Sequence, residues 1–193
     1  MLYLTDRLLA HALLSMHQIK LTTQFAAPLE RCFEMARHLF AYQQAATCIG
    51  GAAGHSAADR NLFSAEGETW WHTLPPIGFS KPTLIWTLTE YDAPNALVFQ
   101  TKAFSLALQY QQIFEWIDVR KTEVSEIFSL QKTPLCTQNT WKKQIEAFLR
   151  ERQLALKQAV ESDQWEKILQ QSPDYEPFFK TAFEENRQEE EEE

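Results

Sequence analysis

FSLALQYQQIFEWIDVRKTEVSEIFSLQ, residues 104–131, alternates apolar and polar side chains along two segments that join near Asp118. This alternation predicts two antiparallel strands, because successive side chains of a strand point to opposite faces. Tyr110, Gln112 and Glu126 interrupt the apolar face. A solid core rarely accepts a carboxylate, since burying an unpaired charge is costly. We therefore expect a curved sheet around a hollow with a few polar groups inside, which is the usual form of a ligand cavity.

Earlier segments show the same alternation. Residues 17–25, 83–91 and 97–101 each place apolar side chains at every second position. A turn signal at residues 92–95 separates the last two of these segments. Short turns between neighbours indicate an antiparallel meander, so we expect about six or seven strands in all.

The region before residue 74 is harder to interpret. Residues 61–66 and 67–73 resemble a hairpin, whereas Gly50, Gly51 and Gly54 predict a loop. A phosphate-binding loop is rejected here because no Lys-Ser or Lys-Thr pair follows and no clear helix opens after a strand.

Helical periodicity appears on both sides of the strand region. Pro28 suits the first turn of a helix, and short helices are expected near 29–37 and 39–47. Residues 138–162 predict one helix of about 24 residues, roughly 36 Å long. Asp163 is expected to cap a further helix. The apolar stripe of the long helix consists of Trp141, Ile145, Phe148 or Leu149, Leu156, and Ala159 or Val160.

Composition and charge exclude several classes of function. The chain has 45% hydrophobic residues and a net charge of −8, which places it among globular proteins. Seven Glu and one Arg in residues 184–193 carry most of this charge, so the body lacks the basic surface that nucleic acid requires. No metal-ligand spacing or cofactor fingerprint is present, and we expect neither a metal nor a cofactor. The odd set Cys32, Cys48 and Cys136 predicts reduced thiols and a cytoplasmic location.

These patterns divide the chain into four parts. Residues 1–16 predict a short N-terminal helical extension without the features of a signal peptide, too short to span a bilayer. Residues 17–162 form the main domain, and residues 163–183 form a helical appendage. Residues 184–193 are expected to be a disordered acidic tail.

The order of elements resembles the START-like, or SRPBCC, superfamily and most closely its polyketide cyclase/dehydratase-like branch. LTEYDAP at residues 88–94 is similar to a strand-end motif of that branch. YQQIF at 110–114 and TEVSE at 122–126 correspond to its His-x-His-x-Phe and Thr-x-hydrophobic-x-Asp segments. The resemblance covers residues 17–162.

The chain departs from the branch at several of these positions. Tyr110 and Gln112 stand in place of the two histidines, and Lys121 replaces the usual glycine. A role carried by those imidazoles therefore does not transfer. Glu126 keeps the acidic character of the second segment.

The resemblance implies an α+β helix-grip fold, in which a curved antiparallel sheet wraps around the long C-terminal helix and a cavity lies between them. Extra helices lie at the two ends of the chain. The inward faces assigned from alternation would line the cavity. These ligand-binding candidates are Trp70, His72, Trp86, Phe99, Thr101, Tyr110, Gln112, Phe114, Glu126 and Phe128 from the sheet, and Trp141, Ile145 and Phe148 from the helix.

Three functions follow from this arrangement. The first is non-catalytic binding or transport of a small hydrophobic or aromatic ligand, such as a lipid, an isoprenoid or a polycyclic metabolite. The second is a cyclase/dehydratase-type or isomerase-type enzyme that uses Glu126 with His72 or Tyr110. The third is a protein-interaction module, in which Trp165 and the cluster Phe178, Phe179 and Phe183 bind a partner instead of capping the domain. No nucleic acid and no stable membrane insertion are expected.

The candidate polar residues each have a structural alternative. Glu126 could accept hydrogen bonds from Tyr110 or Gln112, and a β-bulge before it would turn it to solvent. His72 is more often a core histidine than a functional one, and a dyad with Glu126 requires that the two meet. His38 is expected at the surface or at a helix cap.

Overall fold

The computed structural model of the chain describes residues 16–57, 60–73, 83–103, 106–131, 138–162, 164–172 and 175. Of the expected N-terminal helix over residues 1–16, only Met16 is described, and it begins the first strand. The cluster of Phe178, Phe179 and Phe183 and the tail 184–193 lie outside the described residues, as do Cys136 and Asp163.

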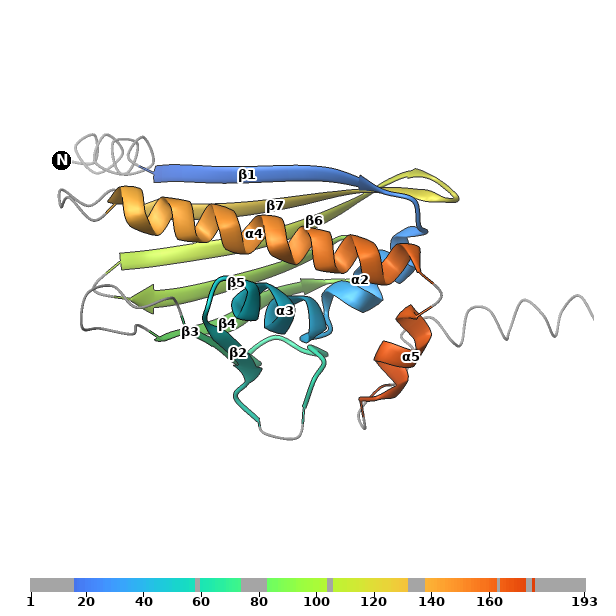
Figure 1. Ribbon diagram of the computed structural model, residues 1–193, viewed down its shortest axis with the longest axis horizontal. Coiled ribbons are helices and arrows are strands. Elements are labelled where there is room, and N and C mark those ends of the chain that lie inside the picture. Colours follow the sequence, from blue (N-terminus) through green and yellow to red (C-terminus); the bar gives the residue numbers. More distant parts are fainter. Residues whose placement is uncertain are drawn as a thin grey trace, which may run out of the picture.

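The described chain forms a seven-stranded sheet in which every neighbouring pair is antiparallel. Its order is β1-β7-β6-β5-β4-β3-β2, so the first and last strands of the meander lie side by side. This confirms the expected curved antiparallel sheet (Figure 1). The strands are β1 (Met16–Phe25), β2 (Ala52–His55), β3 (Thr69–Thr73), β4 (Thr83–Asp92), β5 (Ala96–Ala103), β6 (Leu106–Asp118) and β7 (Lys121–Gln131).

Three helices cover one face of the sheet. The long helix α4 (Gln138–Glu161) runs along this face, and α2 (Leu29–Ala36) and α3 (Phe40–Cys48) lie beside it (Figure 1). A short helix, α5 (Trp165–Gln170), follows α4. The expected helix-grip architecture is therefore confirmed. None of the helices in the described part of the chain is both long and apolar enough to cross a membrane.

Polar side chains of α4 fasten this helix to the free edge of β1. Gln153 Nε2 donates to the carbonyl of Leu21 at 3.1 Å, and Lys157 Nζ donates to the carbonyl of Gln24 at 2.9 Å. Positions 153 and 157 are one turn apart on the same side of the helix. These bonds satisfy backbone groups at the sheet edge and fix α4 lengthwise on the sheet.

The expected loop around Gly50, Gly51 and Gly54 is wrong in part, because residues 52–55 form strand β2 against β3. A Cβ atom on Gly51 would lie 2.0 Å from the carbonyl oxygen of Thr73, and one on Gly54 would lie 2.7 Å from the Trp71 ring. These two glycines permit a close approach of neighbouring strands. Gly50, with φ of +79°, is the residue that makes the turn.

The expected hairpin between residues 61–66 and 67–73 is also wrong. Strand β3 pairs with β2 on one side and with β4 on the other. Leu62 instead makes an isolated bridge with His38. Closeness in the sequence therefore does not identify the strand that pairs with β3, because strand pairing depends on packing throughout the sheet.

Helix α5 packs against the domain. Leu169 is fully buried, and the Arg31 guanidinium lies 4.7 Å from the centre of the Trp165 ring. His38 Nδ1 accepts the backbone N–H of Phe40 at 3.0 Å, so the neutral ring donates through Nε2 to Ser172 Oγ at 2.7 Å. His38 is therefore buried at the start of α3. The expected surface position is wrong; the N-cap residue of α3 is Leu39, and His38, one residue before it, accepts the N–H of the first helical residue.

We predict that the segment around α5 caps the domain. Leu169→Ala should lower the free energy of unfolding by about 2–4 kcal/mol, because it removes a fully buried side chain. Urea denaturation measures this loss. Leu154→Ala on α4 is the matched control, because Leu154 is 51% exposed and should cost less than about 0.5 kcal/mol.

Truncation after Ser162 tests the same role on the whole appendage. The melting temperature should fall, since the buried Leu169 and the contact of Ser172 with His38 are both lost. A truncated protein that melts with the full chain would favour partner recruitment over capping.

Candidate functional site

The register of β6 and β7 brings the predicted polar residues together. Gln112 lies directly opposite Glu126, and Tyr110 lies opposite Phe128. The one irregularity in this pair of strands falls between Trp116 and Asp118, at the end of β6. No bulge therefore turns Glu126 outward, and its side chain is fully buried.

Arg152, from the middle of α4, pairs with Glu126. Its Nη1 donates to Glu126 Oε1, and both side chains are completely buried. Its Nη2 donates to Gln112 Oε1 at 3.0 Å and to the carbonyl of Ala36 at 3.2 Å. One guanidinium therefore links α4 to β6, β7 and the end of α2.

Two tyrosines complete the cluster. Gln112 Nε2 donates to the hydroxyl of Tyr110 at 3.0 Å and also to the hydroxyl of Tyr42 on α3. The Arg152 guanidinium lies 4.1 Å from the centre of the Tyr42 ring, a cation–π geometry. We call Tyr42, Tyr110, Gln112, Glu126 and Arg152 the polar network.

Burial and charge set the ionisation of this network. Burial raises the pKa of the Glu126 carboxyl, and the neighbouring Arg152 charge opposes that rise. A guanidinium does not lose its proton in proteins, so its buried charge requires the Glu126 carboxylate beside it. Burial raises the pKa of Tyr42 to about 12 and the pKa of Tyr110 well above its usual value. Both phenols therefore stay neutral.

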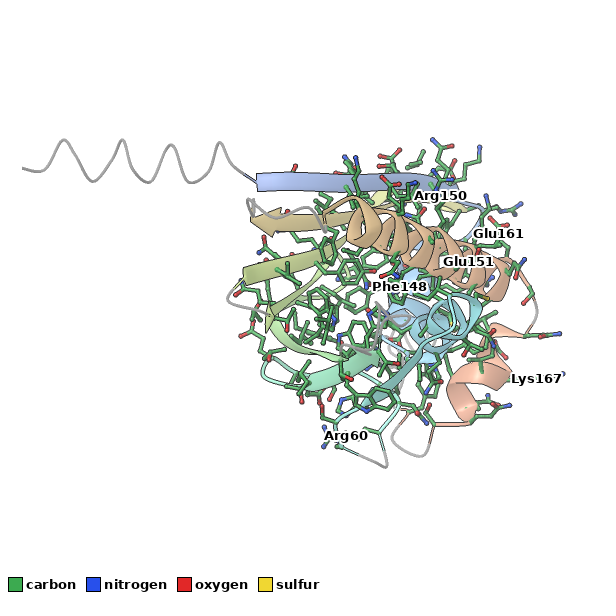
Figure 2. The ribbon with its side chains drawn as sticks, turned by 60° about the vertical axis from the view of Figure 1, so that its left-hand side comes forward. Arg60, Phe148, Arg150, Glu151, Glu161 and Lys167 are labelled. Atoms are coloured by element: carbon green, nitrogen blue, oxygen red, sulfur yellow. The ribbon has the colours of Figure 1, made fainter. Side chains whose placement is uncertain are left out.

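A second cluster occupies β3, β4 and the first half of α4. The His72 ring stacks on Phe148 with their centres 4.4 Å apart, and on Trp70 at 5.9 Å. Trp70 in turn stacks on Trp86, its direct cross-strand partner, at 6.0 Å. Phe148 lies on the sheet-facing side of α4 (Figure 2). We call Trp70, His72, Trp86 and Phe148 the aromatic half of the interior.

The aromatic half contains polar ring atoms that are not satisfied. His72 Nε2, Trp70 Nε1 and Trp86 Nε1 are buried and have no hydrogen-bond partner among the described residues. Burial also lowers the pKa of His72 from 6.5 to about 4, so its ring is neutral at pH 7. Buried indole N–H groups usually find a partner.

The predicted inner face is buried throughout the described chain, but its role in binding a ligand stays a prediction. The side chain of Trp141 lies outside the described residues. Those found buried on this face are Trp70, His72, Trp86, Phe99, Thr101, Tyr110, Gln112, Phe114, Glu126, Phe128, Ile145 and Phe148.

His72 and Glu126 do not form a dyad. They lie on β3 and β7, which are separated in the sheet by β4, β5 and β6. His72 Nε2 has no described hydrogen-bond partner, and Glu126 pairs with Arg152. Of the three catalytic candidates, Glu126 and Tyr110 share one network and His72 belongs to the other cluster.

The sequence interpretation missed Arg152 and Tyr42. Arg152 occupies the helical stripe between Leu149 and Leu156, at a spacing of three and four residues. A charged residue in the middle of an apolar stripe, opposite a carboxylate on the sheet face, was the available signal. Tyr42 lies on a short helix whose orientation no local pattern specifies.

No group of three or more metal-binding side chains is found within the residues that the structure describes. Of the described cysteines, Cys32 is buried, Cys48 is exposed, and both are free thiols. Burial raises the pKa of Cys32 to about 12, which makes a reactive thiolate at this position unfavourable.

Solved structures share this arrangement at low sequence identity. Protein CV1439 from Chromobacterium violaceum has a TM-score of 0.54 and 12% identity, over 76% of this chain and 99% of that one. The Zhui aromatase/cyclase from Streptomyces sp. R1128 has a TM-score of 0.53 and 11% identity, over 79% of this chain and 96% of that one. The di-domain ARO/CYC StfQ from the steffimycin biosynthetic pathway has a TM-score of 0.52 and 17% identity, over 77% of this chain and 46% of that one.

No protein-family model and no curated protein matches the sequence. At these identities the structural likeness shows the fold alone. The expected helix-grip fold is confirmed, and structures named as aromatase/cyclases are among those that share it.

We predict that Glu126→Gln lowers the free energy of unfolding by about 3 kcal/mol, because it leaves the Arg152 charge buried without a counterion. Chemical denaturation measures the change. Glu146→Gln is the matched control: Glu146 pairs with Lys142 at 3.9 Å on the exposed side of α4, where such a pair contributes less than about 1 kcal/mol.

The double variant Glu126→Gln/Arg152→Met should lose less free energy of unfolding than the two single variants lose in sum, because no buried charge remains. Equal costs for Glu126→Gln and Glu146→Gln would contradict the importance of the buried pair.

We predict that His72 makes the protein less stable in acid. The unfolded chain binds a proton at this residue below about pH 6.5, whereas the folded chain does so only near pH 4. The free energy of unfolding therefore falls as the pH drops from 6.5 to 4, by about 2–4 kcal/mol from this residue. His72→Phe should show a shallower loss over this window and a parallel curve between pH 7 and 8. Parallel curves at every pH would refute the assignment.

Proposed function

We propose that this protein binds a small hydrophobic or aromatic ligand, such as a lipid, an isoprenoid or a polycyclic metabolite, between the sheet and α4. The observation that carries the proposal is the aromatic half of the interior. Three of its buried ring nitrogens lack a partner among the described residues, while the surrounding surface is apolar. A mostly apolar site with a few convergent polar atoms is the usual composition of a small-molecule site.

The fold supports the same proposal. The structures that share it include two proteins named as aromatase/cyclases, one of them from the steffimycin biosynthetic pathway. In this chain the candidate surface is built from strands β3 and β4 and from α4, so it rests on regular elements. Rigid elements lower the entropic cost of fixing a ligand.

Non-catalytic binding fits the polar network better than catalysis does. A general base needs a carboxylate free to take a proton from its substrate. Glu126 is held by Arg152, and Gln112 is held by both Arg152 and the two tyrosines. Most polar atoms of these side chains therefore have protein partners, although Glu126 Oε2 and Arg152 Nε have none among the described residues.

Native mass spectrometry of the protein purified from cells should show a bound species that is released on denaturation. Ile145→Trp should reduce the bound fraction, because Ile145 is buried on the sheet-facing side of α4 and a larger ring would fill space there. Leu154→Trp on the exposed side of the same helix is the control.

A protein that carries no ligand, combined with an experimental structure whose interior has no room for a drug-sized molecule, would refute the proposed function. If Ile145→Trp does not fold, the wild-type measurement still decides.

A further inference from the structure

The hairpin that joins β6 and β7 extends past the neighbouring strands of the sheet (Figure 1). Strand β5 begins at Ala96, which lies opposite Ile113 of β6. Strand β1 ends at Phe25, which lies opposite Thr122 of β7. The described part of the sheet therefore offers residues 115–121 no partner strand beyond the hairpin itself. We call residues 115–121 the hairpin tip.

Three large apolar side chains of the hairpin tip are exposed to solvent. Trp116 is 63% exposed, Val119 is 75% exposed and Ile117 is 39% exposed. Trp116 follows the buried Phe114 at a spacing of two, which places it on the inner face of the sheet. Ile117 occupies the irregularity at the end of β6, and Val119 lies in the turn. The exposed apolar surface is therefore not confined to one side of the hairpin.

Two basic side chains lie beside this apolar group. Arg120 and Lys121 follow Val119 directly, and both are exposed. Asp118 Oδ1 accepts the backbone N–H of Arg120 at 2.8 Å, so this acid holds the turn. The acids Glu115 and Glu123 lie opposite each other, roughly 7–10 Å back along the strands, a separation at which salt screens most of their effect. The charges nearest the apolar group are therefore positive.

The size and shape of the hairpin tip favour a lipid surface over a protein. A stable protein interface buries about 800 Å² on each partner, from roughly 20–30 residues, and the tip offers only three apolar side chains. A protein surface would also cover mainly one side of the hairpin, whereas a lipid layer surrounds an inserted side chain. Tryptophan is enriched where headgroups meet acyl chains, and Lys and Arg extend from that depth to the headgroups.

We propose that the hairpin tip binds the surface of a phospholipid bilayer. Trp116, Ile117 and Val119 enter the boundary between headgroups and acyl chains, and Arg120 and Lys121 bind anionic headgroups. The contact is peripheral and reversible, because its strength depends on a small apolar area and a few charges. It therefore agrees with the expectation that the chain makes no stable membrane insertion.

The hairpin tip is separate from the aromatic half of the interior. Thr122 Oγ1, next to the tip, donates to the carbonyl of Ala27 at 2.9 Å. Glu161, the last residue of α4, accepts the N–H of Ala26 at 2.8 Å. The tip therefore lies by the C-terminal end of α4, whereas Phe148 of the aromatic half lies in the first half of that helix. Membrane contact at the tip requires no ligand in the interior.

Co-sedimentation with lipid vesicles tests the apolar part of the contact. The vesicles contain about one part phosphatidylserine to four parts phosphatidylcholine. We expect the wild-type protein to bind, Trp116→Gln to bind about tenfold more weakly and Val119→Gln about threefold more weakly. Ile85→Gln is the matched control, because Ile85 is 60% exposed on β4 and lies outside the tip. It should change binding less than about twofold, and all three variants should keep the melting temperature of the wild type.

A pair of charge variants tests the basic part. Arg120→Gln/Lys121→Gln should bind the same vesicles about fivefold more weakly and should lose less than about twofold on phosphatidylcholine alone. Lys142→Gln/Lys143→Gln is the matched control, because it removes the same charge from exposed positions of α4. It should bind like the wild type.

Several results would overturn the proposal. A folded wild-type protein that stays in solution with both kinds of vesicle is one, and equal binding by wild type and Trp116→Gln is another. An equal loss in Ile85→Gln would show adsorption without a site. Self-association that Trp116→Gln abolishes, seen by analytical ultracentrifugation without vesicle binding, would assign the tip to a second copy. If Trp116→Gln does not fold, Val119→Gln and the charge variants decide. None of these results bears on ligand binding in the interior.

Discussion

The buried pair of Arg152 and Glu126 fixes the relation between the long helix and the sheet. Its guanidinium reaches β7 through the carboxylate, β6 through Gln112 and α2 through the Ala36 carbonyl. A buried ion pair adds little net stability over a well-packed apolar pair, because both charges must leave water. Its effect lies in geometry, since rotating α4 or sliding β7 by one residue would separate the charges. We infer that the pair contributes specificity of packing more than free energy.

This constraint divides the interior into two adjacent parts. The polar network lies between α4 and strands β6 and β7, and its donors and acceptors are mostly directed at one another. The aromatic half lies on β3, β4 and the first half of α4, where the contacts are ring stacking. Tyr42 joins the two, because its hydroxyl accepts from Gln112 and its ring packs 4.6 Å from Trp70. The charges of the polar network compensate each other, and both parts keep buried polar atoms without a partner among the described residues.

Alternation and periodicity in the sequence were enough for the main elements. The second strand expected within residues 104–131 is β7 (Lys121–Gln131), and the helix expected at 138–162 is α4 (Gln138–Glu161). Both segments have one face buried by many partners, so the local pattern and the tertiary structure agree. Strand β2 could not be recognised from the sequence, because glycines such as Gly51 and Gly54 are also typical of turns. Their role here is to allow close contact with Thr73 and Trp71, which are distant in the sequence.

Side-chain partners distant in the sequence limited the prediction of the site. The burial of His38 depends on Ser172, which is 134 positions away. The sequence correctly places the Glu126 carboxylate on the inner face. The structure changes the interpretation of this carboxylate, because Arg152 is paired with it. When the stripe of α4 is defined only by its hydrophobic residues, Arg152 is left out of it. The pair of Glu126 and Arg152 joins two different elements, so the pattern within either segment alone does not predict it.

The residues at positions 110 and 112 make sense as parts of the network with Arg152. The amide of Gln112 accepts from the guanidinium at one end and donates to two tyrosine hydroxyls at the other. An imidazole at this position would gain a positive charge in acid and would then repel Arg152 at close range. Glutamine and tyrosine stay neutral here, so the network keeps one charge state while His72 remains the titratable group of the aromatic half. The two positions at which the resembled branch has histidines are therefore held in a fixed hydrogen-bonded arrangement in this chain.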